Sequence, residues 1–253
     1  MSPSSTIEPS GPRDDLPAYD AFLRRAESDP NVVGLLLHGS RGFDAYLTEE
    51  SDVDVIVVVD HDPEGWRTPH GGPVEAWPMT LPEFREHAMP GHRDAWNRSA
   101  FLGVKVVLDK LDGEIARIVD RKRNLTDVEA RAIFIVSLDD YINALFRSLH
   151  NLEAGRELEG RLDAMETIPP LLTTVFALDT RVRPFNKWLR HQVQAQPLSI
   201  DGVVDLVEQL VREPSAAVQR AVFRTVETAA RDAGFGAEID GWEPDVAWLR
   251  NGN

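Results

Sequence analysis

The sequence of 253 residues contains no cysteine. Disulfide bonds, thiolate nucleophiles and cysteine-based metal sites are therefore excluded. The chain also lacks an apolar run of the roughly 18 residues that a membrane-spanning helix needs. Its first residues show no basic segment followed by an apolar stretch, as a secretory signal would. These absences predict a cytoplasmic protein without a membrane segment.

Positive charge is also scarce. The chain has 27 Lys and Arg against 42 Asp and Glu, a formal net charge of −15. Nonspecific binding to nucleic acid or anionic lipid depends on cations that neutralise phosphates, so the charge argues against such partners and against a template-directed polymerase. It favours a cationic small substrate, although the same charge also promotes solubility.

The sequence changes texture twice along its length. Residues 1–15 are rich in Ser, Pro and Gly and are predicted to be disordered. The region 16–125 mixes helical stretches with short apolar or β-branched runs, which predict strands at 32–37, 52–59, 74–79 and 101–108. Strand signals are missing from 126–253. The pattern predicts an α+β fold in which a sheet-containing domain precedes an all-helical domain.

The helical region begins at a clear start signal. Thr126 opens a Thr-Asp-Val-Glu capping box, and a long helix with one apolar stripe is expected after it. The stripe comprises Phe134, Leu138, Tyr141, Leu145, Leu149 and Leu152. Further helices are predicted at 160–177, 184–194, 200–211 and 214–233.

Two carboxylates open the second predicted strand. Asp52 and Asp54 are two residues apart, so both side chains point to one face, while Val53 and the valines that follow point to the other. Two neighbouring carboxylates repel each other and resist desolvation. A bound Mg²⁺ resolves the conflict, because it prefers carboxylate oxygens, water and substrate phosphates. Asp52 and Asp54 are therefore candidate metal ligands.

A Gly-Ser pair ends the first predicted strand. Gly39 permits a close approach of backbone to a ligand, and Ser40 begins a short predicted helix whose N–H groups suit a phosphate. The Ser40 hydroxyl and Arg41 are expected to add contacts to a triphosphate. Ser51, just before the carboxylates, could either face the phosphates or cap a turn.

The order Gly39-Ser40, eleven intervening residues and Asp52-Val53-Asp54-Val55 resembles the motif of the DNA-polymerase-β-like nucleotidyltransferase superfamily. The resemblance implies a small mixed β-sheet flanked by helices. It implies two Mg²⁺ ions held by the paired aspartates. It also implies transfer of a nucleoside monophosphate from a triphosphate such as ATP, with release of pyrophosphate.

The superfamily usually supplies a third carboxylate from a neighbouring strand. Glu75 in Val74-Glu75-Ala76-Trp77 fits this role, as a metal ligand or as the acceptor of the substrate proton. Asp109 is the alternative. Its context, Asp-Lys-Leu-Asp-Gly, is more typical of a turn that leads into a helix, so we favour Glu75.

More loosely, the chain resembles two-domain antibiotic adenylyltransferases of the aminoglycoside-modifying type, in which a helical domain follows the catalytic one. The segments VEAWPMTLPEF and KVVLDKLDGEIARIV in the region 16–125, and FALDTRVRPFNKWLR in the helical region, look like segments of such proteins. This resemblance makes Asp140 a candidate general base or amine-binding group, with Asp139 as the alternative and an ordinary solvated helix side as the plain interpretation. Arg183 and Lys187 are candidates for contacts to the β- and γ-phosphates, or else for ion pairs within their own domain.

The histidines and tryptophans do not predict a further functional site. His61, His70, His87 and His92 lack a recognised metal-ligand spacing, so no zinc site is predicted among them. The tryptophans at 77, 96, 188, 242 and 248 are predicted to be packing anchors, and the last two to dock the C-terminal tail.

These observations predict a Mg²⁺-dependent adenylyltransferase that acts on a hydroxyl of a small cationic acceptor, with antibiotic resistance as one role. Two alternatives stay open: an antitoxin-like enzyme that modifies a protein or RNA, and a nucleotide-binding regulator without catalysis. A homodimer is compatible with the sequence.

Overall fold

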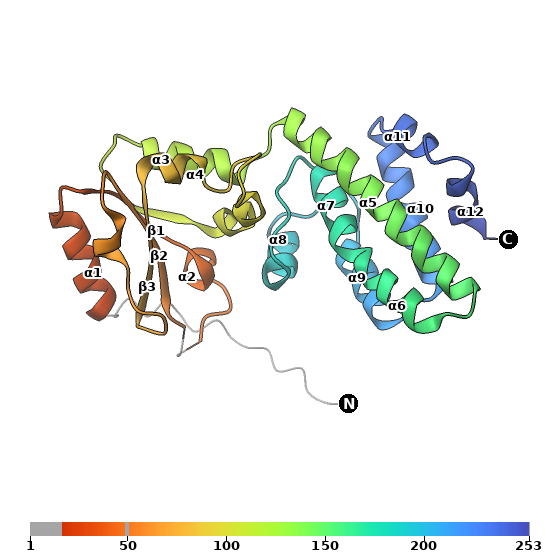
Figure 1. The fold of residues 1–253 in the computed structure, drawn as a ribbon, viewed down its shortest axis with the longest axis horizontal. Coiled ribbons are helices and arrows are strands. Elements are labelled where there is room, and N and C mark those ends of the chain that lie inside the picture. Colours follow the sequence, from red (N-terminus) through yellow and green to blue (C-terminus); the bar gives the residue numbers. More distant parts are fainter. Residues whose placement is uncertain (1–16, 49–50, 253) are drawn as a thin grey trace. The chain divides into compact units, whose positions relative to one another are not determined.

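The computed structural model describes residues 17–48 and 51–252. The chain divides into two compact units, of which the first ends at Arg123 and the second begins at Asn124 (Figure 1). A sheet with helices in the first unit and helices alone in the described part of the second confirm the predicted α+β fold. The segment 1–15, predicted to be disordered, lies outside the described residues.

The first unit is built around a four-stranded mixed sheet. Its strands are β1 (Val32–Leu37), β2 (Val53–Val59), β3 (Val74–Thr80) and β4 (Lys105–Asp109), in the spatial order β3-β2-β1-β4. β2 and β3 are parallel, and the other neighbours are antiparallel. The fourth strand is shorter than predicted, because a 3₁₀ helix, η2 (Ala95–Gly103), precedes it and the Val104 N–H closes a turn onto the carbonyl of Phe101.

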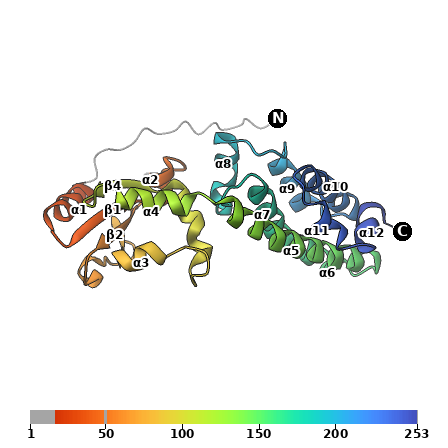
Figure 2. The ribbon, with the colours of Figure 1, turned by 90° about the horizontal axis from the view of Figure 1, so that it is seen from above.

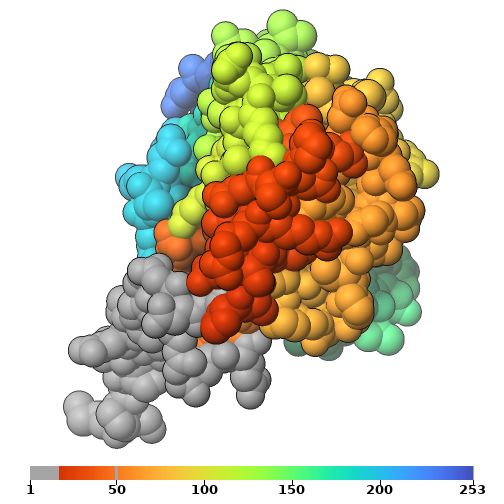
Figure 3. All heavy atoms as spheres, turned by 90° about the vertical axis from the view of Figure 1, so that its left-hand side faces the viewer, coloured from red at the N-terminus to blue at the C-terminus, as the bar shows by residue number. Residues whose placement is uncertain are grey.

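Helices cover both faces of this sheet. The odd-numbered valines of β2, from Val53 to Val59, pack in one apolar cluster with α1 (Pro17–Ser28). Ile56 and Val58 point to the other face, where they pack in a cluster with residues of α3 (Leu81–Glu86) and α4 (Glu114–Arg123). Figure 2 labels both helices beside the strands of the sheet. In the space-filling view, the red residues that include α1 lie across the front of the unit, beside residues coloured orange that follow later in the chain (Figure 3). The alternation therefore assigns Asp54, which precedes Ile56 by two residues, to the face that carries α3 and α4.

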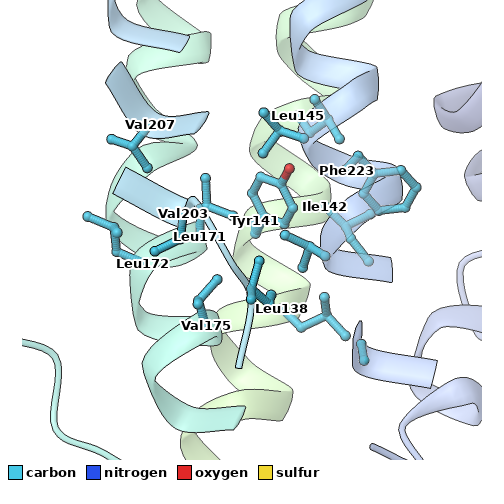
Figure 4. Close-up of a cluster of buried hydrophobic side chains, with 14 of the residues drawn as sticks. Leu138, Tyr141, Ile142, Leu145, Leu171, Leu172, Val175, Val203, Val207 and Phe223 are labelled. Atoms are coloured by element: carbon cyan, nitrogen blue, oxygen red, sulfur yellow. The ribbon is translucent and has the colours of Figure 1, made fainter. Parts of the chain in front are cut away.

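The second unit is organised around α5 (Asp127–Glu153). Thr126 and Glu129 form the predicted capping box at its start. Four of the helices that build the core of the unit contribute the side chains labelled in Figure 4. Among them are Leu138, Tyr141, Ile142 and Leu145 from α5, Leu171, Leu172 and Val175 from α7, Val203 and Val207 from α9, and Phe223 from α10. The period of three and four residues in the α5 stripe is therefore explained by burial.

The predicted helix 160–177 is two helices, α6 (Glu157–Glu166) and α7 (Ile168–Leu178). Pro169 and Pro170 cannot donate backbone hydrogen bonds to the preceding turn, so they stand in the first turn of a new helix. The remaining elements are η1 (Pro63–Trp66), α2 (Gly39–Phe43), η3 (Asn186–Trp188), α8 (Leu189–Ala195), α9 (Val203–Arg212), α10 (Ala216–Asp232), α11 (Gly236–Asp240) and α12 (Asp245–Asn251).

The tryptophans do not all serve as packing anchors. Trp188 is buried, and Trp242 and Trp248 pack against the core of the second unit as predicted for the tail. The prediction was wrong for Trp96, whose side chain on η2 is 68% exposed. None of the described helices combines the length and apolar composition needed to cross a membrane.

Candidate functional site

Three carboxylates meet where β2 and β3 begin. Asp52 directly precedes β2, Asp54 is its second residue, and the parallel register pairs Asp54 with Glu75 of β3. Each of the three offers a carboxylate oxygen, and these oxygens lie within 4.8 Å of one another. All three retain access to solvent. The structure therefore brings together the residues that the sequence singled out as metal ligands, in an arrangement that suits a hard divalent cation.

Gly39 lies directly against this group. Its φ of +62° is left-handed, and a Cβ atom at this position would lie 2.2 Å from Oδ2 of Asp54. No side chain other than hydrogen fits there without displacing the carboxylate. The backbone of His38 is also tied to β2, because its N–H donates to the carbonyl of Asp54 at 3.0 Å. The turn after β1 is thus built around Asp54.

The other predicted phosphate contacts have structural partners within the first unit. Arg41 donates from Nε to the carbonyl of Asp52 and from Nη2 to that of Ser51, both at 3.1 Å. Ser51 accepts a hydrogen bond at 2.9 Å from the N–H of Thr48, and Ser40 lies in α2 next to Gly39. Arg41 therefore holds the backbone at the start of β2, and its contact to a phosphate stays a prediction.

Two histidines at this site were not among the predicted site residues. The imidazole of His70 contacts Oε1 of Glu75 at 2.8 Å, and the N–H of Gly71 donates to the same oxygen at 2.5 Å. These contacts hold the pKa of Glu75 below its usual value. On the other side, burial lowers the pKa of His38 to about 4, against the opposite influence of Asp52. His38 is therefore neutral at pH 7. In the sequence, only the segment Gly-Gly-Pro after His70 could have indicated a turn, which here places His70 beside Glu75 on β3.

Asp109, the alternative third carboxylate, serves another purpose. It lies on β4, where it pairs with Gly34, and β1 separates β4 from β2. Its two oxygens accept hydrogen bonds from the N–H groups of Leu111 and Ala116, at 3.0 and 3.1 Å. Asp109 therefore fixes the turn into α4, as its sequence context indicated.

The second unit carries a pocket of about 710 Å³ between α5, α6 and α7. Its polar lining comprises Ser137, Asp140, Asn143, Arg147, Glu166 and Thr173, and its apolar lining comprises Ala132, Ile133, Val136, Ala144, Pro169 and Pro170. Arg147 is paired with Glu166 at 3.1 Å and with Asp163 at 3.5 Å. Among the described residues, Asp140 has no ion-pair partner. The volume and mixed lining are typical of small-molecule sites.

The structure separates Asp140 from its alternative. Asp139 accepts a hydrogen bond at 3.0 Å from the indole N–H of Trp242, so it anchors the C-terminal tail. Asp140 lines the pocket instead. Of the two, Asp140 is the carboxylate that a ligand of the pocket can reach.

The basic cluster is engaged within its own unit. Arg183 donates to the carbonyl of Pro169 at 3.1 Å and to Oδ1 of Asn186 at 2.8 Å, and burial lowers its pKa. The ammonium of Lys187 lies 4.7 Å from the ring centroid of Trp188. The contact of Arg183 and Lys187 to phosphates stays a prediction.

Comparison with known proteins gives a distant structural similarity. No family profile and no curated protein matches the chain. Among solved structures, a nucleotidyltransferase-like protein from Exiguobacterium sibiricum 255-15 aligns with 88% of this chain and 74% of its own length, at 12% identity and a TM-score of 0.45. A likeness at that level is too distant to carry functional weight, so function has to be inferred from the geometry of the site.

Proposed function

We propose that this chain is a Mg²⁺-dependent nucleotidyltransferase that transfers AMP from ATP to a hydroxyl of a small cationic acceptor and releases pyrophosphate. The observation that carries the proposal is the group of Asp52, Asp54 and Glu75, with the backbone of Gly39 packed against Asp54. Adenine and the hydroxyl acceptor are taken from the resemblance of the sequence motif.

The residues present fit a magnesium site. Asp52 and Glu75 have no lysine or arginine ion-pair partner among the described residues, and neighbouring carboxylates repel each other. Asp52, Asp54 and Glu75 would hold Mg²⁺, which when bound neutralises phosphate charge and clamps the attacking and leaving oxygens.

The chain's own groups then position the substrates. Ser40 lies beside Gly39, where its hydroxyl would contact a phosphate, and Arg41 keeps the carbonyls of Ser51 and Asp52 in place. Glu75 is oriented by His70 and by the N–H of Gly71. Its lowered pKa keeps it ionised at neutral pH, which suits a metal ligand better than a proton carrier.

The pocket of the second unit supports a small acceptor. Asp140 would bind an amine of the acceptor, while Ile133, Val136 and the prolines of α7 offer apolar surface. Such a lining suits a molecule that combines a cationic group with an apolar body. Arg183 and Lys187 would contact the β- and γ-phosphates.

The test is ATP-dependent mass gain of one nucleotide in a panel of hydroxylated amines, with pyrophosphate release measured in parallel. Activity is expected with Mg²⁺, to be abolished by EDTA and restored by added Mg²⁺. Label from ATP that appears only on protein or RNA would replace the small acceptor by a macromolecule. Activity that survives chelation would refute the metal role of the three carboxylates.

A further inference from the structure

A second group of potential metal ligands lies in the loop between α3 and η2. His87 follows the last residue of α3, and Asp94 precedes the first residue of η2, with His92 between them. One ligand atom from each of the three lies within 4.8 Å of the others. The loop turns back on itself through left-handed backbone at Ala88 and Gly91, with φ of 62° and 82°.

The separations in this group are those of ligands around an ion. Nδ1 of His87 and Nδ1 of His92 each lie 3.6 Å from Oδ2 of Asp94. That exceeds the roughly 2.7–3.2 Å of an N–H···O hydrogen bond. It is close to the separation of roughly 3.4 Å between neighbouring ligands in a tetrahedral site with bonds of about 2.0–2.1 Å. The carboxylate thus lies between two imidazoles without a good hydrogen bond to either.

The surroundings orient the imidazoles. Nε2 of His87 is 2.9 Å from the side-chain amide of Asn97, which occupies the ring nitrogen that faces away from Asp94. The ring of Trp77 meets His87 edge to face, with centroids 4.7 Å apart. The N–H of Asp94 donates to Nδ1 of His92 at 3.2 Å, so this nitrogen is unprotonated, and an ion bound there would displace that hydrogen bond. In metal-binding histidines the outer partner accepts a hydrogen bond from the ring nitrogen that does not bind the ion, as the amide oxygen of Asn97 would for Nε2 of His87 once it faces the ring.

The protonation and charge of the group also fit. His87 is buried, and burial together with Lys122 lowers its pKa, so its imidazole is neutral as a ligand must be. Arg93 approaches Oδ2 of Asp94 at 3.4 Å, but its side chain is 88% exposed and can turn into solvent.

We propose that His87, His92 and Asp94 bind a Zn²⁺ ion through two imidazoles and one carboxylate, with water in the fourth position. The donor set is softer than the three carboxylates at the start of β2 and β3, and it selects zinc over magnesium. A bound ion would fasten the loop 87–94 to the ends of α3 and η2. Trp77, which contacts His87, lies two residues beyond Glu75 on β3, so the ion would also brace the strand that carries the third carboxylate.

The experiment separates the two sites. The full-length chain with Asp52→Asn and Asp54→Asn, which removes the acidic site, is titrated with Zn²⁺ by calorimetry, and bound zinc per chain is counted by mass spectrometry. We expect about one ion per chain. In this background, His92→Asn and Asp94→Asn are expected to weaken binding at least tenfold, while His61→Asn, at an exposed histidine, leaves it unchanged.

Cobalt substitution gives a second readout that does not depend on stability. Co²⁺ should produce visible absorption bands of a four-coordinate site, and these should be lost in His92→Asn. Both His92 and Asp94 are partly exposed, so the variants are expected to fold, which circular dichroism checks. Equal zinc stoichiometry and affinity in the Asp94→Asn and His92→Asn variants would overturn the proposal, and so would a background protein that binds no zinc.

Discussion

Two sets of carboxylates, one in each unit, differ in their partners. In the helical unit, the side chain of Glu227 is 9% exposed and is paired with both Arg231 and Arg250, at 2.8 and 2.6 Å. In the sheet-containing unit, Asp52, Asp54 and Glu75 meet where β2 and β3 begin, and among the described residues Glu75 has only the imidazole of His70 as an ion-pair partner. An acid that stabilises a fold brings its own cations, because an unpaired buried charge is costly. Asp52 and Glu75, which have no lysine or arginine ion-pair partner among the described residues, leave room for a cation from solution.

The largest effect is expected when a carboxylate charge is removed from the first unit. Asp54→Asn should reduce nucleotidyl transfer about a thousandfold, equivalent to roughly 4 kcal/mol of transition-state stabilisation, since the amide cannot hold a divalent ion. Pyrophosphate release measures the loss. Asp60→Asn, at the other end of β2, should retain full activity. An active Asp54→Asn enzyme would show that the three carboxylates have a structural role instead.

Removing the charge from the second unit should change stability rather than catalysis. Glu227→Gln is expected to lower the free energy of unfolding by about 3 kcal/mol, because two arginines lose their partner. Glu157→Gln breaks an exposed pair with Arg161 and should cost at most about 0.5 kcal/mol. Denaturant unfolding at pH 7 compares them. Equal losses would contradict a special role for the buried acid.

The same residue makes stability depend on pH. Its hydrogen bonds to Arg250 and Arg231 hold the pKa of Glu227 below its usual value of 4.5, despite the opposing effect of burial. Its contribution is therefore complete above about pH 4.5 and is lost as the pH falls through the lowered pKa. The difference in unfolding free energy between the wild type and Glu227→Gln should shrink on acidification below pH 4.5. A constant difference would exclude this linkage.

A backbone change sharpens the comparison further. Gly39→Ala should destabilise the first unit by about 2 kcal/mol and reduce activity, because left-handed backbone is strained with a Cβ and that atom would displace Asp54. Gly202→Ala has a similar φ of +68° but nothing within 4 Å of its Cβ, so its cost should be about 1 kcal/mol without loss of activity. Thermal unfolding and pyrophosphate release distinguish the two effects.

The smallest effect is expected in the pocket. Asp140→Asn should raise KM for an amine-bearing acceptor about tenfold, or roughly 1.4 kcal/mol, with kcat less affected. Asp139→Asn keeps an oxygen for Trp242 and should leave KM unchanged. An unaltered KM in Asp140→Asn would show that the amine of the acceptor binds elsewhere. A loss confined to kcat would show the same.

Much of the first site could be predicted from local patterns. Asp52 and Asp54 are on one face because the side chains of a strand alternate, and the buried valines of β2 follow from the same period. Glu75 could be predicted because it is a lone acid between apolar residues on a second short predicted strand. The boundary between α6 and α7 at Thr167 was not predicted, because apolar residues recur at helical spacing on both sides of it. Pro169 and Pro170 were the signal that a new helix begins there.

The sequence by itself determined the α+β order, the strand that presents two acids, and the capping box of α5, because these depend on residues a few positions apart. Only the tertiary structure decided that Glu75 rather than Asp109 joins Asp52 and Asp54, that Asp140 faces a pocket while Asp139 holds Trp242, and that His87, His92 and Asp94 converge. Those outcomes depend on strand order, helix packing and left-handed turns, which bring side chains together through the path of the whole chain rather than through spacing along it.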